Sequence, residues 1–141
     1  MHRHSSSPGR SFRAGSSSAE LALLLPLLGL FLLFTVDFAR LYYHYSIVTN
    51  CARNGALYGS DPVAAQESNY PTLTAAALAD ASDLTPQPTV TSTNGVDGSG
   101  NAYVEVTVVY PFQTISNYPG LSNPINLSRT VRMRVAPSVP N

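Results

Sequence analysis

The chain has 141 residues, which is room for one domain of ordinary size. Its formal net charge is zero, which argues against nucleic acid as a partner, because proteins that bind nucleic acid usually carry a basic excess on one face. Cys51 is the only cysteine, so neither an internal disulfide nor a cysteine-based zinc site stabilises the fold.

Residues 1–16 are predicted to form a disordered, basic tail on the cytoplasmic side. They contain no acidic residue and bury too little apolar surface to order themselves. Positive charge beside a first span holds that end of the chain in the cytoplasm. The arginines concerned are Arg3, Arg10 and Arg13. The H-x-H pattern of His2 and His4 lies in this tail and is interpreted as incidental, with a metal site as the alternative.

The run from Leu21 to Val36 is predicted to span a membrane. It carries no charged residue, and at 1.5 Å per residue its length is roughly 24 Å, somewhat short of a hydrocarbon core about 30 Å thick. Ala19 and the serines before it extend the span inward. Asp37 and Arg40 mark the exit, spaced as a helical i,i+3 pair, and aromatic rings that favour the interface follow. These rings are Tyr42, Tyr43 and Tyr45.

The topology that follows is a single-pass protein of the plasma (inner) membrane, with its N-terminus in the cytoplasm and its C-terminal domain outside. A secreted protein with a cleaved signal peptide is the rival interpretation, because the basic start and the apolar run fit one. The segment after the run, TVDFARLYY, lacks the small-x-small pattern of a signal cleavage site. The membrane anchor is therefore favoured.

The helix is predicted to continue past the membrane, so that residues 17–58 form one transmembrane and amphipathic helix. No proline occurs between Leu41 and Leu57. Apolar residues recur there at steps of three and four, as on one face of an amphipathic helix. They are Leu41, Tyr45, Val48, Ala52 and Ala56. Stop signals at 58–62, Tyr-Gly-Ser-Asp-Pro, end the helix.

Residues 59–141 are predicted to form a small extracytoplasmic domain. The Ala-rich segment from Thr72 to Ser82 favours a short helix capped by Thr72 or Thr74. Three segments favour β-strands: Thr89–Thr93, Ala102–Tyr110 and Leu127–Val135. A flexible turn over residues 94–101 and a long loop over residues 111–126 connect them.

The predicted fold class is α+β. Valines alternate along the second strand and place one apolar face on the sheet. Because a small sheet alone is marginally stable, the outer half of the long helix is expected to pack on a three-stranded antiparallel sheet and complete the core.

No nucleophile with a base, carboxylate pair, metal spacing or phosphate loop is convincing in the sequence, so we predict neither an enzyme nor a cofactor. His44 is interpreted as an amphipathic surface residue, with proton-linked behaviour as the alternative. Cys51 is interpreted as a small core residue without a redox role. The glycines of 95–100 lie in a turn and open no helix, which excludes a nucleotide loop. The N-glycosylation pattern at 126–128 carries little weight.

Glu20 lies at the cytoplasmic end of the span, where burying an unpaired charge is costly. The simple interpretation is that its carboxylate extends into the head-group layer. Gly15 lies five residues before it, where the basic tail ends.

Three segments together resemble the signature of TadE-like proteins, which are pilin-like components of the tight-adherence (Flp) pilus system. They are Ser-Ala-Glu-Leu-Ala-Leu-Leu-Leu-Pro-Leu at 18–27, Asp-Phe-Ala-Arg at 37–40 and Ala-Arg-Asn-Gly-Ala at 52–56. The resemblance covers about Gly15 to Leu57, and a small domain after the helix agrees with the family pattern.

The resemblance implies that a prepilin peptidase cleaves between Gly15 and Ser16. Glu20 then becomes the fifth residue of the mature chain, where pilin-like proteins carry a glutamate that pairs with the free amine of a neighbouring subunit. Such pairing supplies the partner that a carboxylate in a membrane needs. Leu21 departs from the pattern, since Flp-type pilins usually have tyrosine there, so a processed and an intact N-terminus both stay open.

Two functions follow as hypotheses. The first is a structural assembly protein, a minor pseudopilin or accessory subunit of a tight-adherence pilus, with the bilayer, other pilin-like subunits, the pilus membrane machinery and a prepilin peptidase as partners. The second is a free-standing anchored module that binds a ligand or envelope partner through the loop at 111–126.

Overall fold

The computed structural model describes residues 14–116 and 118–137, with side chains from Ser18 onward. The chain divides into two compact units at the peptide bond between Val36 and Asp37. The predicted tail lies almost entirely outside the described residues, as do its histidines and arginines.

The long helix α1 runs from Ala14 to Ser60, three residues beyond the predicted start and two beyond the predicted end. In the first unit it is an isolated helix. In the second unit, residues of α1 from Leu41 onward contribute to the same core as the sheet. The α+β fold class predicted from the sequence is confirmed.

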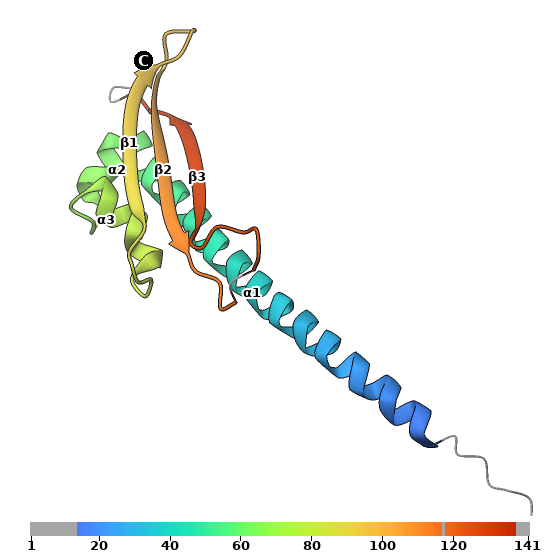
Figure 1. The fold of residues 1–141 in the computed structure, drawn as a ribbon. Helices are drawn as coiled ribbons and strands as arrows, with labels where there is room; N and C mark the ends of the chain where they lie inside the picture. Colours follow the sequence, from blue (N-terminus) through green and yellow to red (C-terminus); the bar gives the residue numbers. More distant parts are fainter. Residues whose placement is uncertain (1–13, 117, 138–141) are drawn as a thin grey trace, which may run out of the picture. The chain divides into compact units, whose positions relative to one another are not determined.

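Three strands form one antiparallel sheet in the order β1-β2-β3 (Figure 1). Their bounds are Thr89–Val96 for β1, Ala102–Phe112 for β2 and Ile125–Arg134 for β3. The alternation predicted for the second strand is confirmed, since Val104, Val106, Val108 and Tyr110 are all buried.

The core lies between one face of this sheet and the second half of α1. The helix contributes Val48, Cys51, Ala52 and Ala56, all fully buried. Small side chains at these positions let the helix backbone approach the strands closely. The predicted apolar stripe is confirmed with one exception. Tyr45 is 38% exposed, because the residue of that turn that faces the sheet is His44, whose ring stacks on Tyr110.

The motif at 52–56 acquires a packing role in this core. A Cβ atom added at Gly55 would lie 3.0 Å from both Ala77 Cβ and Val106 Cγ1. Such a distance is tighter than ordinary contact, so only glycine fits without displacing its neighbours.

Three short elements follow α1: α2 at Pro62–Glu67, α3 at Leu73–Ala77 and the 3-10 turn η1 at Leu78–Ala81. Of the two predicted caps, Thr72 and Thr74, the structure has Thr72, whose hydroxyl accepts from Ala75 N at 3.1 Å. Helix α2 was not predicted, because Asp61-Pro62 also has the composition of a helix stop. Here it starts a new helix, since Asp61 Oδ1 accepts from Val63 N and Ala64 N at 3.1 and 3.0 Å.

Two connections differ from prediction. The turn predicted over 94–101 is shorter, because β1 stays paired as far as Val96 and the Asp97 carboxylate accepts from Ser99 N and Asn101 N at 2.9 and 2.8 Å. Strand β2 continues through Pro111, which was assigned to the loop. Proline is tolerated there because β1 begins opposite Val109, so no strand pairs with β2 on that side of Pro111.

Candidate assembly surface

The first unit presents an almost wholly apolar helix surface. Large apolar side chains from Leu21 to Val36 are between 40% and 79% exposed. A soluble monomer rarely exposes an apolar patch of this extent, which suggests a membrane anchor. Among the described residues, α1 is the one helix long and apolar enough to cross a membrane.

Thr35 carries the one polar side chain of residues 21–36, and its hydroxyl is bonded within the helix. The Thr35 hydroxyl donates to Phe31 O at 2.8 Å, which removes the cost of placing it in hydrocarbon. Pro26 lies inside the helix and leaves the carbonyl four residues earlier without its helical partner.

A Cβ at Gly29 would meet nothing within 4 Å, so this position lies on an open surface where a neighbouring helix backbone could approach.

The predicted processing and pairing residues lie at the start of α1. Gly15 and Ser16 belong to its first turn. Glu20 lies one turn further along and its side chain is exposed, so it is accessible to a neighbouring chain. Processing after Gly15 and pairing through Glu20 remain predictions.

Asp37, the first residue of the second unit, is buried and bonded to a distant loop. Its Oδ1 accepts from Ile115 N at 2.9 Å, and its Oδ2 accepts from Ser116 N at 3.3 Å and from Tyr118 Oη at 3.0 Å. The predicted i,i+3 partner is present as well, with Arg40 Nη1 3.3 Å from Asp37 Oδ1. These groups form the Asp37 cluster: Asp37, Arg40, Ile115, Ser116 and Tyr118.

Electrostatics favour the ionised form of Asp37. The backbone N–H of Ile115 is the main cause that lowers its pKa, against desolvation, which raises it; Tyr118, Ser116 and Arg40 also lower it. Burial and the bond to the carboxylate raise the pKa of Tyr118, so its hydroxyl stays protonated and donates. A buried carboxylate that accepts several hydrogen bonds from one loop holds that loop in place.

Arg40 extends the cluster toward the sheet. Its Nη1 donates to Gln113 O at 3.5 Å, and its guanidinium carbon lies 5.3 Å from the centroid of the Phe112 ring. The predicted interface aromatics beside it point outward: Tyr42, Tyr43 and Tyr45 are 66%, 63% and 38% exposed. Their place at a membrane interface remains a prediction.

His44 is half-buried, whereas the sequence placed it on the surface. Its ring stacks on Tyr110 at a centroid distance of 5.4 Å and lies 5.2 Å from Phe112. His44 Nδ1 is 2.6 Å from Arg40 O. Because a carbonyl only accepts, this nitrogen carries the proton.

Cys51 is fully buried, which confirms its interpretation as a core residue. Burial raises the pKa of its thiol to about 11, so almost none is present as the reactive thiolate near neutral pH.

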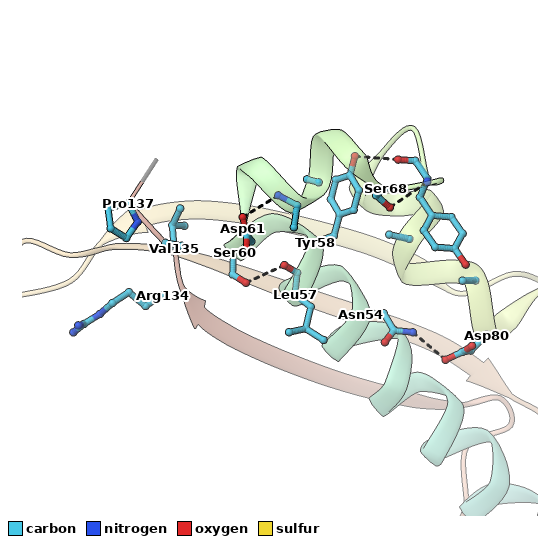
Figure 2. Close-up of a pocket in the computed structure, with 16 residues that line it drawn as sticks. Asn54, Leu57, Tyr58, Ser60, Asp61, Ser68, Asp80, Arg134, Val135 and Pro137 are labelled. Atoms are coloured by element: carbon cyan, nitrogen blue, oxygen red, sulfur yellow. Dashed lines mark hydrogen bonds between the residues drawn. The ribbon is translucent and has the colours of Figure 1, made fainter. Parts of the chain in front are cut away.

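A groove of about 750 Å³ lies where the end of α1, α2 and the end of β3 meet, not at the loop that the sequence suggested for ligand binding (Figure 2). Apolar atoms line most of it, from Leu57, Tyr58, Ala65, Val135 and Pro137 among others, and the charged residues Asp61, Asp80 and Arg134 also line it. Its polar side chains are engaged in local bonds, as between Asn54 Nδ2 and Asp80 Oδ2 at 2.9 Å.

Among the described residues, no group of three or more His, Cys, Asp or Glu side chains could hold a metal ion. The bonds from the loop to Asp37 were not predicted, since the sequence offered only the pair with Arg40. A carboxylate just outside a span, where it needs several donors, is the signal that could have indicated a distant partner.

Residues 15–57 match the TadE-like protein family model. This match confirms the resemblance seen in the sequence and covers under a third of the chain, ending before the sheet begins. The family is one of pilus structural and assembly proteins and not of enzymes. No match was found among curated proteins or among solved structures.

Proposed function

We propose that this protein, whose residues 15–57 match the TadE-like family model, is a minor pseudopilin or accessory subunit in the biogenesis of a tight-adherence pilus. It acts by packing its apolar helix against the helices of other pilin-like subunits. The observation that carries this proposal is the conjunction of the family match with an exposed apolar surface over the same residues.

The span supports helix–helix assembly as well as anchoring. Its apolar side chains surround the helix, and Gly29 leaves an open position of the kind at which helices pack closely in lipid. The protein inserts as a single-pass inner-membrane protein, with residues 1–16 in the cytoplasm and residues 59–141 outside.

Glu20 supplies specificity in this mechanism. A prepilin peptidase cuts between Gly15 and Ser16, and the new amino group of one subunit pairs with the Glu20 carboxylate of the next. Such an ion pair in a medium of low dielectric fixes the axial register between helices, because one misplaced turn leaves both charges unpaired. The first turn of a helix has free N–H groups and frays readily, which gives a peptidase access to the peptide bond at Gly15.

The test combines genetics with mass spectrometry. Deleting the gene in the source bacterium should abolish or greatly reduce surface pili, and the full-length gene should restore them. The mature protein extracted from membranes should begin at Ser16. Normal piliation in the deletion strain would overturn the proposal, whereas an intact N-terminus with lost piliation would change only the role, from filament subunit to static assembly factor.

A second function is favoured by the groove, whose apolar lining and volume suit a peptide or small-molecule ligand. In that case the protein is an anchored binding module. Replacing Ala65 with glutamate places a charge in the groove without touching the span. Pili that persist in this variant but are lost in a Glu20 variant support assembly, and the reverse supports binding.

A further inference from the structure

We propose that the loop over residues 113–116 and 118–124 is a second membrane-contact element, which the Asp37 cluster holds against the lipid surface beside the exit of the span. The proposal rests on the membrane anchoring proposed above. Its partner is the bilayer interface itself, the layer of head groups and upper acyl chains.

The contact with Asp37 determines how close the loop lies to the end of the span. This residue follows Val36 directly, and its carboxylate accepts from Ile115 N at 2.9 Å. One helical residue advances about 1.5 Å, while the interfacial layer on each side of a bilayer is about 5–8 Å thick. A group bonded to Asp37 therefore lies within the interfacial layer whenever residues up to Val36 lie in hydrocarbon.

The loop has the composition that this layer favours. No charged residue occurs between Glu105 and Arg129. Ile115 and Leu121 are 61% and 58% exposed, although the same loop buries Asp37. Uncharged polar and apolar residues suit the interface, whereas a loop that faces only water usually carries charged residues.

The adjoining helix surface shows the same character. Phe38 and Tyr42 are 71% and 66% exposed and lie four residues apart, on one side of the helix. The charge-free span is roughly 24 Å long against a hydrocarbon core of about 30 Å, so residues that flank it must make up part of the difference. The exposed apolar groups on the helix and on the loop are available to do so.

Depth measurement by spin labelling tests this directly on the full-length chain in phosphatidylcholine–phosphatidylglycerol vesicles. Native Cys51 is buried, with its pKa raised to about 11, so it stays in place while single cysteines are introduced. Ile115→Cys and Leu121→Cys are the test positions. Leu28→Cys reports the span, and Val63→Cys, at an α2 position that is 54% exposed, reports water.

We expect the ratio of collision rates with oxygen to those with a water-soluble nickel chelate to be several-fold higher at positions 115 and 121 than at 63, and lower than at 28. Values at 115 and 121 equal to that at 63 overturn the proposal. A label at 115 shielded from both reagents overturns it as well, because it reports a protein contact. If the ratio at position 28 also equals that at position 63, residues 21–36 do not span the membrane, and the proposed function is overturned as well.

A separate measurement tests whether Asp37 holds the loop at the membrane interface. Adding Asp37→Asn to the Ile115→Cys chain should shift the ratio at 115 toward the value at 63, with unchanged circular dichroism. Adding Asp83→Asn, which removes an exposed charge elsewhere, should leave the ratio unchanged. An unchanged ratio in the Asp37→Asn chain would overturn the role of the cluster.

Discussion

Asp37 accepts a hydrogen bond from the backbone N–H of Ile115 at 2.9 Å across 78 residues of sequence. This contact joins the first residue after the apolar segment to the connection between β2 and β3. A charge that only marks a membrane exit in the sequence is, in the folded chain, a buried carboxylate that accepts hydrogen bonds from a distant loop.

Replacing Asp37 with asparagine should weaken this cluster, because an amide has one acceptor oxygen and its NH2 group faces the donors of Ser116 and Tyr118. We expect faster hydrogen exchange at the amides of Ile115 and Ser116 and a lower melting temperature. The pH dependence follows from the lowered pKa of Asp37. A folded-state pKa below the unfolded value of about 3.8 gives stability that is present above that value and is lost as the pH falls through the folded pKa.

Asp97 also has a lowered pKa, so acid weakens the parent chain at both sites. The measurement is therefore the difference in melting temperature between the parent and Asp37→Asn from pH 6 to pH 2. This difference should shrink toward zero at the acid end. A constant difference would contradict ionisation of Asp37 as its source.

Replacing Glu20 with alanine should leave membrane insertion intact but lower incorporation into pili by about tenfold, which is the effect of losing roughly 1.4 kcal/mol of pairing energy. Glu67→Ala, on the exposed side of α2, is the matched control and should assemble normally. Membrane fractionation and pilus counts by electron microscopy measure the two quantities. Equal piliation in both variants would argue against inter-subunit pairing.

Arginine at Leu28 should prevent stable insertion. A charge at the centre of a span costs about 2.5–3.5 kcal/mol on the insertion scale, against a small gain for leucine. Val63→Arg, at an exposed position of α2, should insert as the parent does. Alkaline extraction of membranes separates inserted from peripheral chains, and a Leu28→Arg protein that stays in the pellet would reverse the assignment of the span.

Alanine at Gly55 should destabilise the second unit, even though alanine is more favourable than glycine inside a helix by about 1 kcal/mol. Its Cβ would lie 3.0 Å from Ala77 Cβ and from Val106 Cγ1, and such overpacking typically costs about 1–3 kcal/mol. We expect a net loss of up to about 2 kcal/mol in urea unfolding. Gly98→Ala, where nothing lies within 4 Å, is the control, and equal stability of the two variants would contradict close packing at Gly55.

The sequence by itself determined the long helix, the three strands and most of the faces that they bury. A charge-free apolar run, apolar residues at helical steps and strict alternation along the second strand are local periodic patterns, and each depends only on neighbours in the chain. The family segment at 15–57 is likewise contiguous, so its motifs could be recognised without a structure.

Only the tertiary structure decided which distant groups meet. The bond between Asp37 and Ile115, the stacking of His44 on Tyr110, and the space that excludes a side chain at Gly55 each join segments that are far apart in sequence. The ends of β1 and β2 also depended on pairing, since Val96 and Pro111 belong to strands only because of what lies opposite them. Periodicity specifies the face that a residue occupies, whereas contacts between remote segments depend on how those faces pack.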